Sequence, residues 1–301
     1  MIKIKNIFGI LILVALFFAC SNDTIVNPFA DIDHEALALS DNDSLVKFLQ
    51  NHYYDDTVDS VKTLVSGQTA LYSDSKLKTL DVEENDIAYK LYVYVLDEGT
   101  PTIDNGYPTR VDSVFTKYSG RTLTGTSLAT SAFDGNTVGV WLSLTNVVDG
   151  WAYGFTQFKG GDLKKDANGG VFNGPITYLN GGKGVLFIPS GLAYPSSNTS
   201  NYISSLVDTN IMFYVDLLEF VPNTDHDNDG VPSISEDVDG NGNPNDDDTD
   251  SDGFLNYFDT DDDGDGVLTI DEDANGDGNP ANDFSDPNNP TLADYLNPDI
   301  F

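Results

Sequence analysis

The sequence predicts an α+β domain in which one short helix lies under a curved sheet, followed by a repetitive acidic tail. The helix is indicated by Trp151, Phe155 and Phe158, which recur at helical spacing and form one apolar stripe. The sheet is indicated by strand-like apolar runs on both sides of that helix in the sequence. The tail is indicated by composition, because residues 221–301 contain 24 acidic residues and no Lys or Arg.

Five runs are expected to form strands, namely residues 87–96, 111–118, 138–144, 184–189 and 211–220. The first run alternates apolar side chains with Lys90, Tyr92 and Tyr94, which is the period of a half-buried strand. Gly150 is expected to permit a sharp turn into the helix. Between residues 160 and 183, seven glycines surround a short run, which indicates an inserted hairpin or flap.

The first 19 residues have the proportions of a signal peptide, because Lys3 and Lys5 precede an apolar run too short to span a bilayer comfortably. Ala19 before Cys20 resembles the lipobox of bacterial lipoproteins, in which the signal is removed and the cysteine is lipidated. Cleavage elsewhere by an ordinary signal peptidase is the alternative. The resemblance implies a lipid-anchored protein of the bacterial cell envelope, at the outer membrane and on its periplasmic or surface face.

Residues 20–43 are polar and contain scattered Pro, Asp and Asn, which favours a lipid anchor followed by a linker. Ser44 is a suitable N-cap, and Leu45, Phe48 and Leu49 then form an apolar face. Residues 44–85 are therefore assigned to an N-terminal helical region, although the pattern weakens after Asp55.

The net charge of −35 argues against nucleic acid and anionic membrane surfaces as partners and favours cations. The only cysteine is Cys20, so no intramolecular disulfide can form.

Five short motifs within residues 86–220 resemble, in order and spacing, those of the FKBP-type peptidyl-prolyl isomerases: Tyr118-Ser119-Gly120, Phe133-Asp134, Val147 to Trp151, Phe187 to Tyr194 and Ile211 to Leu218. The resemblance implies a strongly bent antiparallel sheet wrapped on one short helix, with a pocket between them. It departs at Val138 or Val140, where the family often has another pocket aromatic.

The resemblance also implies an aromatic pocket with Trp151 as its floor and Tyr118, Phe133, Tyr194 and Phe213 as its walls. The backbone N–H of Val148, which follows Val147, would hold the substrate carbonyl, and the Tyr194 hydroxyl would donate to a second carbonyl. Asp134 would be the one polar group near the twisting amide. Core packing for Trp151 and Phe213, and a turn or cap role for Asp134, are the structural alternatives.

The chemistry suits these residues, because isomerisation of an Xaa-Pro bond needs no nucleophile and no acid–base pair. The cis and trans forms differ by about 0.5–1 kcal/mol, but amide resonance imposes a barrier of ~18–20 kcal/mol. A dry apolar pocket favours the twisted, less dipolar amide over the planar one. A hydrolase triad would lack a histidine, since His34, His52 and His226 lie outside residues 86–220.

The tail contains three copies of a twelve-residue pattern with carboxylates at positions 1, 3, 5 and 12 and glycine at position 6. The copies are residues 225–236, 248–259 and 261–272, and weaker copies begin at Asp237 and Asp273. Such loops suit Ca²⁺, which takes six to eight oxygen ligands, including the carbonyl at position 7. The expected metal ligands are Asp225, Asp227, Asp229, Val231, Glu236, Asp248, Asp250, Asp252, Phe254, Asp259, Asp261, Asp263, Asp265, Val267 and Glu272.

The segments between these loops are too short for paired EF-hand helices, so the tail resembles thrombospondin type 3 calcium repeats. A disordered acidic spacer is the alternative.

The predicted function is a peptidyl-prolyl isomerase that helps proline-containing polypeptides fold at the cell envelope, with no cofactor for catalysis and structural calcium in the tail. Two other classes remain open. One is a non-catalytic module that binds peptides in the same pocket, and the other is a calcium-dependent surface structural protein.

Overall fold

The computed structural model describes residues 29, 32–124, 127–128 and 132–300. The expected signal peptide, residues 1–19, and the expected lipidation site, Cys20, lie outside these residues. Within the described part of the chain, no helix combines the length and apolar character needed to cross a membrane.

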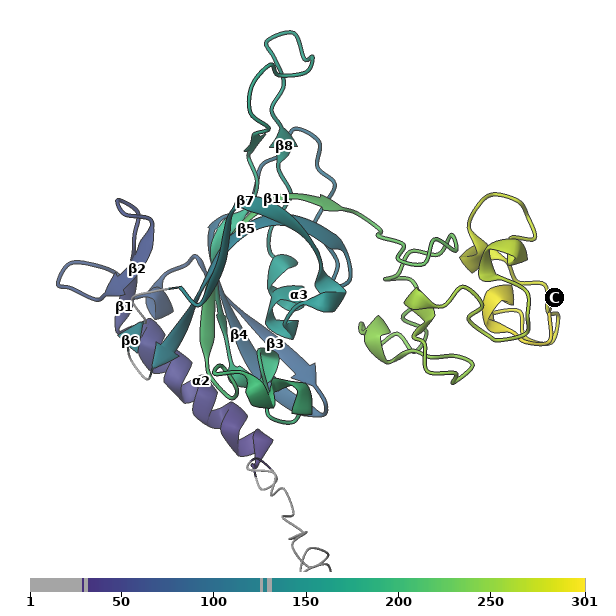
Figure 1. The fold of residues 1–301 in the computed structure, drawn as a ribbon, viewed down its shortest axis with the longest axis horizontal. Helices are drawn as coiled ribbons and strands as arrows, with labels where there is room; N and C mark the ends of the chain where they lie inside the picture. Colours follow the sequence, from purple (N-terminus) through teal and green to yellow (C-terminus); the bar gives the residue numbers. More distant parts are fainter. Residues whose placement is uncertain (1–28, 30–31, 125–126, 129–131, 301) are drawn as a thin grey trace, which may run out of the picture. The chain divides into compact units, whose positions relative to one another are not determined.

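The structure is mixed α/β, with two α-helices and a bent antiparallel sheet (Figure 1). The helices are α2 (His34–Gln50) and α3 (Asp149–Phe155). The strands are β1 (His52–Asp55), β2 (Ser60–Thr63), β3 (Leu77–Glu84), β4 (Ile87–Asp97), β5 (Ser113–Thr124), β6 (Ser127–Leu128), β7 (Asp134–Ser143), β8 (Asp162–Leu163), β9 (Tyr178–Leu179), β10 (Lys183–Ile188) and β11 (Ile211–Val221). Short 3₁₀ helices supply the other regular elements of the described residues.

The main sheet has the order β3-β4-β10-β11-β5-β6, with β7 paired to β5. All its pairs are antiparallel, and the register shifts in three of them, at Lys183/Gly184, Leu217/Glu219 and Thr116/Tyr118. Such irregularities bend strands and increase their twist. Figure 1 shows α3 inside the resulting curve.

Both faces of this sheet are covered. On the inner face, α3 packs against side chains such as Leu91, Leu186 and Ile188. On the outer face, α2 packs Leu45, Phe48 and Leu49 against Tyr92, Tyr94, Val185, Phe187 and Met212. The alternation expected for residues 87–96 therefore holds only up to Leu91, because α2 also buries Tyr92 and Tyr94 on the outer face.

The start of α2 also corrects the predicted boundaries. The helix begins at His34, so residues 34–43 are not linker, and Ser44 lies mid-helix, donating from Oγ to the Ser40 carbonyl at 2.9 Å. After the helix ends at Gln50, the chain forms the hairpin β1–β2 and then β3, an edge strand of the main sheet. Residues 44–85 are thus only partly helical.

The insertion between α3 and β10 contains the short antiparallel pair β8–β9. Its tip exposes Val171 and Ile176. The sequence therefore located an inserted hairpin at the right place in the chain.

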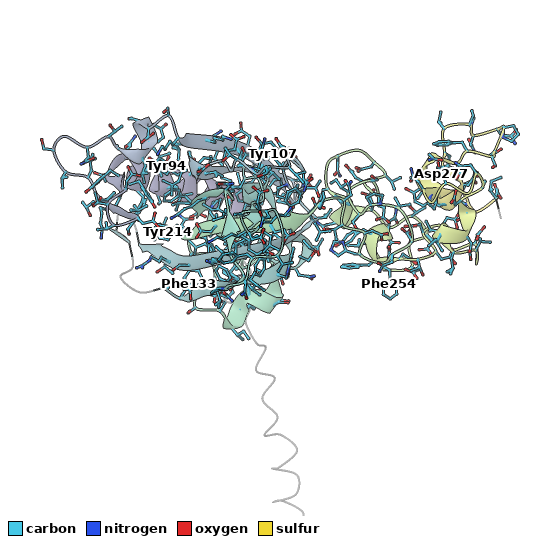
Figure 2. All side chains as sticks on the ribbon, turned by 90° about the horizontal axis from the view of Figure 1, so that it is seen from above. Tyr94, Tyr107, Phe133, Tyr214, Phe254 and Asp277 are labelled. Carbon is cyan, nitrogen blue, oxygen red and sulfur yellow. The ribbon has the colours of Figure 1, made fainter. Side chains whose placement is uncertain are left out.

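The described part of the tail, residues 222–300, contains only 3₁₀ helices: η5 (Pro244–Asp246), η6 (Asn256–Phe258), η7 (Thr269–Glu272), η8 (Pro280–Asn282) and η9 (Asp294–Leu296). A small apolar cluster of Val231, Ala293 and Tyr295 is buried within it. Exposed apolar side chains remain, including Phe254 at the surface of the tail (Figure 2).

Candidate functional site

The first candidate site is built on α3. Trp151 and Phe155 lie on its buried face, as their spacing predicts, and Phe158 follows the helix into the same core. Two glycines on this helix allow it to lie close to β10, since a Cβ on Gly150 would lie 2.4 Å from Ile188 Cγ2 and one on Gly154 2.7 Å from Leu186 Cδ2. Gly150 has no positive φ, so its role is close packing and not the expected sharp turn.

Aromatic rings from β5, from β11 and from the residue just before β7 meet around Trp151 of α3. The indole contacts the Tyr118 ring edge to face at 4.9 Å between centroids, and it contacts the Phe213 ring at the same distance. Phe133 packs on Phe213 at 5.4 Å. Edge-to-face contacts of this kind fix the rings relative to one another. The structure therefore brings these four predicted residues into one cluster.

A cavity of about 910 Å³ opens beside this cluster. Its lining includes seven of the eight predicted pocket residues, which are Tyr118, Asp134, Val147, Val148, Trp151, Tyr194 and Phe213. Only 3% of the Trp151 surface is exposed, so the indole is largely a core group with one edge at the cavity. Core packing and a place in the cavity wall are thus combined in this residue.

Two details of the predicted pocket are different in the structure. Phe133 lies outside the cavity lining and supports Phe213 from behind. Val138 is 82% exposed, and Leu142, farther along β7, lines the cavity instead. Val140, the other expected position, does not line the cavity either. The pairing of β7 with β5 has a register shift between Thr116 and Tyr118, which a sequence pattern does not reveal.

The polar groups of the cavity are hydroxyls, amides and the carboxyl groups of Asp134 and Asp149. Tyr118 donates from its hydroxyl to Asp134 Oδ2 at 3.2 Å, while Asp134 Oδ1 accepts from the N–H of Gly135. Burial, and then the charge of Asp134, raise the pKa of both Tyr118 and Tyr194, so both hydroxyls stay protonated. The rim adds polar residues that the sequence did not single out: Asn85, Asn146, Ser197, Asn198, Thr199 and Asn201.

The second candidate site is the tail, where five consecutive loops share one geometry. In each, the glycine at position 6 has positive φ and donates its N–H to the aspartate at position 1. The five pairs are Gly230–Asp225, Gly242–Asp237, Gly253–Asp248, Gly266–Asp261 and Gly278–Asp273. The left-handed backbone at position 6 explains why glycine recurs there. The weaker copies at Asp237 and Asp273 therefore have the same turn.

Asp225 accepts from the N–H groups of Asn228 and Gly230 with its two oxygens, whereas other ligand-type carboxylates use one oxygen for the loop itself. For example, Asp229 Oδ1 accepts from the N–H of Val231 at 2.8 Å, and Asp265 Oδ1 accepts from Val267 at 2.7 Å. The second oxygens of Asp229 and Asp265 are buried without a hydrogen-bond partner. The same holds for one oxygen each of Asp227, Asp248, Asp261 and Asp263 and for both oxygens of Glu236 and Glu272. Burying a carboxylate oxygen without a hydrogen-bond donor costs free energy, and a bound cation would offset that cost.

Three sets of predicted ligands come together in space. Carboxylate oxygens lie within 4.8 Å of one another in the sets Asp225/Asp227/Asp229, Asp248/Asp250/Asp252 and Asp261/Asp263/Asp265. In a fourth set, Asp247 joins Asp237 and Asp239 of the weaker copy that begins at Asp237. A fifth set, Asp229/Glu236/Asp262, was not expected from the sequence, because its members belong to different loops. Spacing within one loop carries no information about a set that crosses loops.

The crowding has an electrostatic consequence. Burial, followed by the charges of nearby carboxylates, raises the pKa of Glu236 to about 10 and that of Glu272 to about 8. Residues 221–301 contain no Lys or Arg, so no basic side chain of the tail offsets these charges.

A family model described as BamM C-terminal matches residues 226–296, which form the acidic tail. That description differs from the thrombospondin type 3 repeats that the sequence suggested. A search of curated proteins found no match to the chain.

Among solved structures, the chain is similar to a peptidyl-prolyl cis-trans isomerase from Pseudomonas syringae, with 18% identity, a TM-score of 0.36 and coverage of 64% of this chain and 98% of that one. It is also similar to FkpA from Escherichia coli, with 21% identity, a TM-score of 0.33 and coverage of 50% and 54%. A third similar structure is the N-terminal domain of FKBP42 from Arabidopsis thaliana, with 16% identity, a TM-score of 0.32 and coverage of 49% and 94%. The matched region thus spans about half of the FkpA chain.

Proposed function

We propose that residues 86–220 bind proline-containing polypeptides in the cavity beside Trp151 and isomerise their Xaa-Pro bonds. The observation that supports this most is the gathering of seven expected residues around one cavity of about 910 Å³. They come from β5, β7, the start of α3, the loop after β10, and β11, so their meeting is a property of the fold and not of one motif.

The proposed mechanism is desolvation and positioning. The aromatic cluster offers the prolyl ring an apolar surface, which favours the twisted amide because its charge separation is smaller than that of the planar amide. The Val148 N–H and the Tyr194 hydroxyl would hold the flanking carbonyls, and Asp134 would lie near the twisting bond. A protonated Tyr194 is a donor, as this role requires.

Exchange NMR on an Xaa-Pro peptide with the full chain tests this proposal without adding a protease. We expect the protein to accelerate cis–trans exchange, and we expect Trp151→Phe to lower that rate at least ~10-fold, which corresponds to about 1.4 kcal/mol of transition-state stabilisation. Trp141→Phe is the matched control, because Trp141 stacks on Phe115 and is not part of the cavity lining. No acceleration by the wild-type protein would exclude the enzyme.

A non-catalytic peptide-binding module is the second candidate. It is favoured by the lack of an aromatic residue at Val138 or Val140, where the resemblance leads one to expect one, and by the polar rim. The same NMR experiment separates the two, since a module would shift peptide resonances without changing the exchange rate.

We also propose that the loops 225–236, 248–259 and 261–272 bind structural Ca²⁺. The buried carboxylate oxygens without partners and the recurring glycine turn support this proposal. Limited proteolysis of the full chain tests it. Cleavage within residues 222–300 should be rapid in EGTA and slow in millimolar calcium, because unneutralised carboxylates repel one another. Equal rates in the two conditions would contradict it.

The place of action that we propose is the bacterial cell envelope, with Cys20 as a lipid anchor. The apolar run that ends in Ala19-Cys20 supports this proposal. Radiolabelled palmitate should enter the wild-type protein and not Cys20→Ser, whereas equal labelling would contradict the anchor. If deletion of the tail abolished surface assembly while Trp151→Phe had no effect, the surface structural protein would be favoured instead.

A further inference from the structure

One set of carboxylates in the tail joins two loops that lie far apart in the sequence. Oxygens of Asp229, Glu236 and Asp262 lie within 4.8 Å of one another. Asp229 and Glu236 are positions 5 and 12 of the loop 225–236, whereas Asp262 is position 2 of the loop 261–272. Position 2 is not a ligand position in the expected calcium pattern.

These three side chains are the most deeply buried carboxylates of the tail. Glu236 is 0% exposed, and Asp229 and Asp262 are each 1% exposed. Both oxygens of Glu236, Oδ2 of Asp229 and Oδ1 of Asp262 have no hydrogen-bond partner. Carboxylates this close and this buried are tolerated when a bound cation neutralises them.

The orientation of Asp262 is fixed by its own loop. Thr269, which is fully buried, donates from Oγ1 to Asp262 Oδ2 at 2.6 Å. The other oxygen, Oδ1, is left without a partner and is the atom available to the neighbouring loop. The ligand-type residues on either side, Asp261 and Asp263, instead gather with Asp265 in their own loop.

In the other two loops as well, the side chain at position 2 contacts the side chain at position 9. His226 Nδ1 lies 2.8 Å from Ser233 Oγ, and Asn256 donates to Thr249 Oγ1 at 2.9 Å. In those loops position 2 is a histidine or a threonine and carries no carboxylate. Only the loop 261–272 therefore uses this position to present an acid to another loop.

We propose that Asp262 is a ligand, contributed across loops, of the cation held by the loop 225–236, so that one ion ties residues 225–236 to residues 261–272. Asp225, Asp227, Asp229, the Val231 carbonyl and a bidentate Glu236 would supply six oxygens, and Asp262 a seventh. Seven lies within the range of six to eight oxygens that Ca²⁺ takes. This inference rests on the proposed binding of calcium by the tail.

Calcium titration of the full chain, followed by calorimetry, tests the inference with Asp262→Asn and the matched control Asp271→Asn. Asp271 is exposed, belongs to the same loop and carries the same charge. We expect Asp262→Asn to weaken the binding of one ion at least ~10-fold, because even residues that only orient ligands matter to this extent. Asp271→Asn should leave every affinity within twofold of wild type.

Double variants identify the loop to which the lost ion belongs. If Asp262 and Glu236 hold the same ion, the double variant Asp262→Asn/Glu236→Gln should bind only one ion fewer than wild type, as the more affected single variant does. The double variant Asp262→Asn/Glu272→Gln should bind two ions fewer. The reverse pattern would assign Asp262 to its own loop and overturn the inference. The inference would also be overturned if the Asp262→Asn variant bound calcium with the affinities of the wild type, although calcium binding by the tail would still stand.

The outcome for the wild-type protein separates the two proposals. If the wild-type chain bound no calcium, the proposed function of the tail would fail and the inference with it. Proteolysis gives a readout that needs no binding model: in saturating calcium, Asp262→Asn should be cut between residues 237 and 260 more rapidly than Asp271→Asn. Equal protection of the two variants would contradict a tie between the loops.

Discussion

At the scale of single residues, the candidate pocket depends on a position that has no side chain. A Cβ on Gly120 of β5 would lie 2.5 Å from Phe213 Cε1 and 2.7 Å from Phe133 Cζ. These are atoms of rigid rings packed on each other and, through Phe213, on Trp151. Gly120 therefore gives the aromatic cluster the space it needs.

Gly120→Ala should displace both rings, and overpacking of this kind costs about 1–3 kcal/mol of stability. We also expect weaker peptide binding, because Phe213 lines the cavity. Denaturant unfolding and peptide titration measure the two effects. Ser119→Ala is the control, since its side chain points to the opposite face of the same strand. Unchanged stability and binding in Gly120→Ala would show that the rings are free to move.

At the scale of elements, α2 is joined to the segment that leads to Tyr194. Asp41 is buried, and its Oδ2 accepts from the N–H of Ser190 at 2.9 Å and from Ser190 Oγ at 2.6 Å. Ser190 begins the 3₁₀ helix η3 (Ser190–Leu192), which directly precedes Tyr194. The helix on the outer face of the sheet thus holds one wall of the cavity.

Asp41→Ala should destabilise the protein by about 1–3 kcal/mol, because it leaves the buried Ser190 hydroxyl without its acceptor, while the Ser190 N–H keeps Asn210 Oδ1 as an acceptor. Asp41→Asn keeps an acceptor and should cost less. Chemical denaturation at pH 7 measures the free energy of unfolding of both variants. If Asp41→Ala lost no more stability than an alanine substitution at an exposed position such as Asp43, the stabilising role of the Asp41–Ser190 hydrogen bonds would be contradicted.

The same residue predicts a pH dependence. Burial raises the pKa of Asp41 above its ordinary value of 3.8, against the lowering effect of the Ser190 hydrogen bonds. The folded state then binds the proton more tightly than the unfolded chain, so this contribution to stability is fully present below 3.8 and is lost as the pH rises through the folded pKa. The stability of wild type relative to Asp41→Asn should therefore increase as the pH falls from 7 to 4. A constant difference would contradict the raised pKa.

The elements that could be predicted were those with a strong and uninterrupted pattern. The stripe of Trp151 and Phe155 predicted α3, and the apolar runs predicted β4, β10 and β11 close to their observed bounds. The runs also located β5 and β7, but β5 ends later, at Thr124, and β7 begins earlier, at Asp134. The first half of α2 was missed because Asp41 occupies a core position of the helix face formed by Ala38, Leu45, Phe48 and Leu49. A buried acid with a distant partner interrupts the apolar stripe, so sequence periodicity alone places the start of the helix too late in the chain.

At the scale of the whole molecule, long-range contacts limited what the sequence could reveal. The spacing within each acidic loop predicted which carboxylates gather locally, and the structure brings those sets together. The sequence did not reveal that Asp262 meets Asp229 and Glu236, that Leu142 lines the cavity, or that Phe133 stands behind Phe213. Each of these depends on how separate segments fold onto one another.

The proposed isomerase function depends on a cavity that gives a proline-containing peptide access to the indole of Trp151. Trp141→Phe makes Trp151 the only tryptophan of the chain, so the fluorescence of that variant reports the cavity directly. We expect an Xaa-Pro peptide to change this emission in a saturable way, and the same peptide with alanine in place of proline to change it far more weakly. If the Xaa-Pro peptide left this emission unchanged at every concentration, binding of the peptide beside Trp151 would be contradicted.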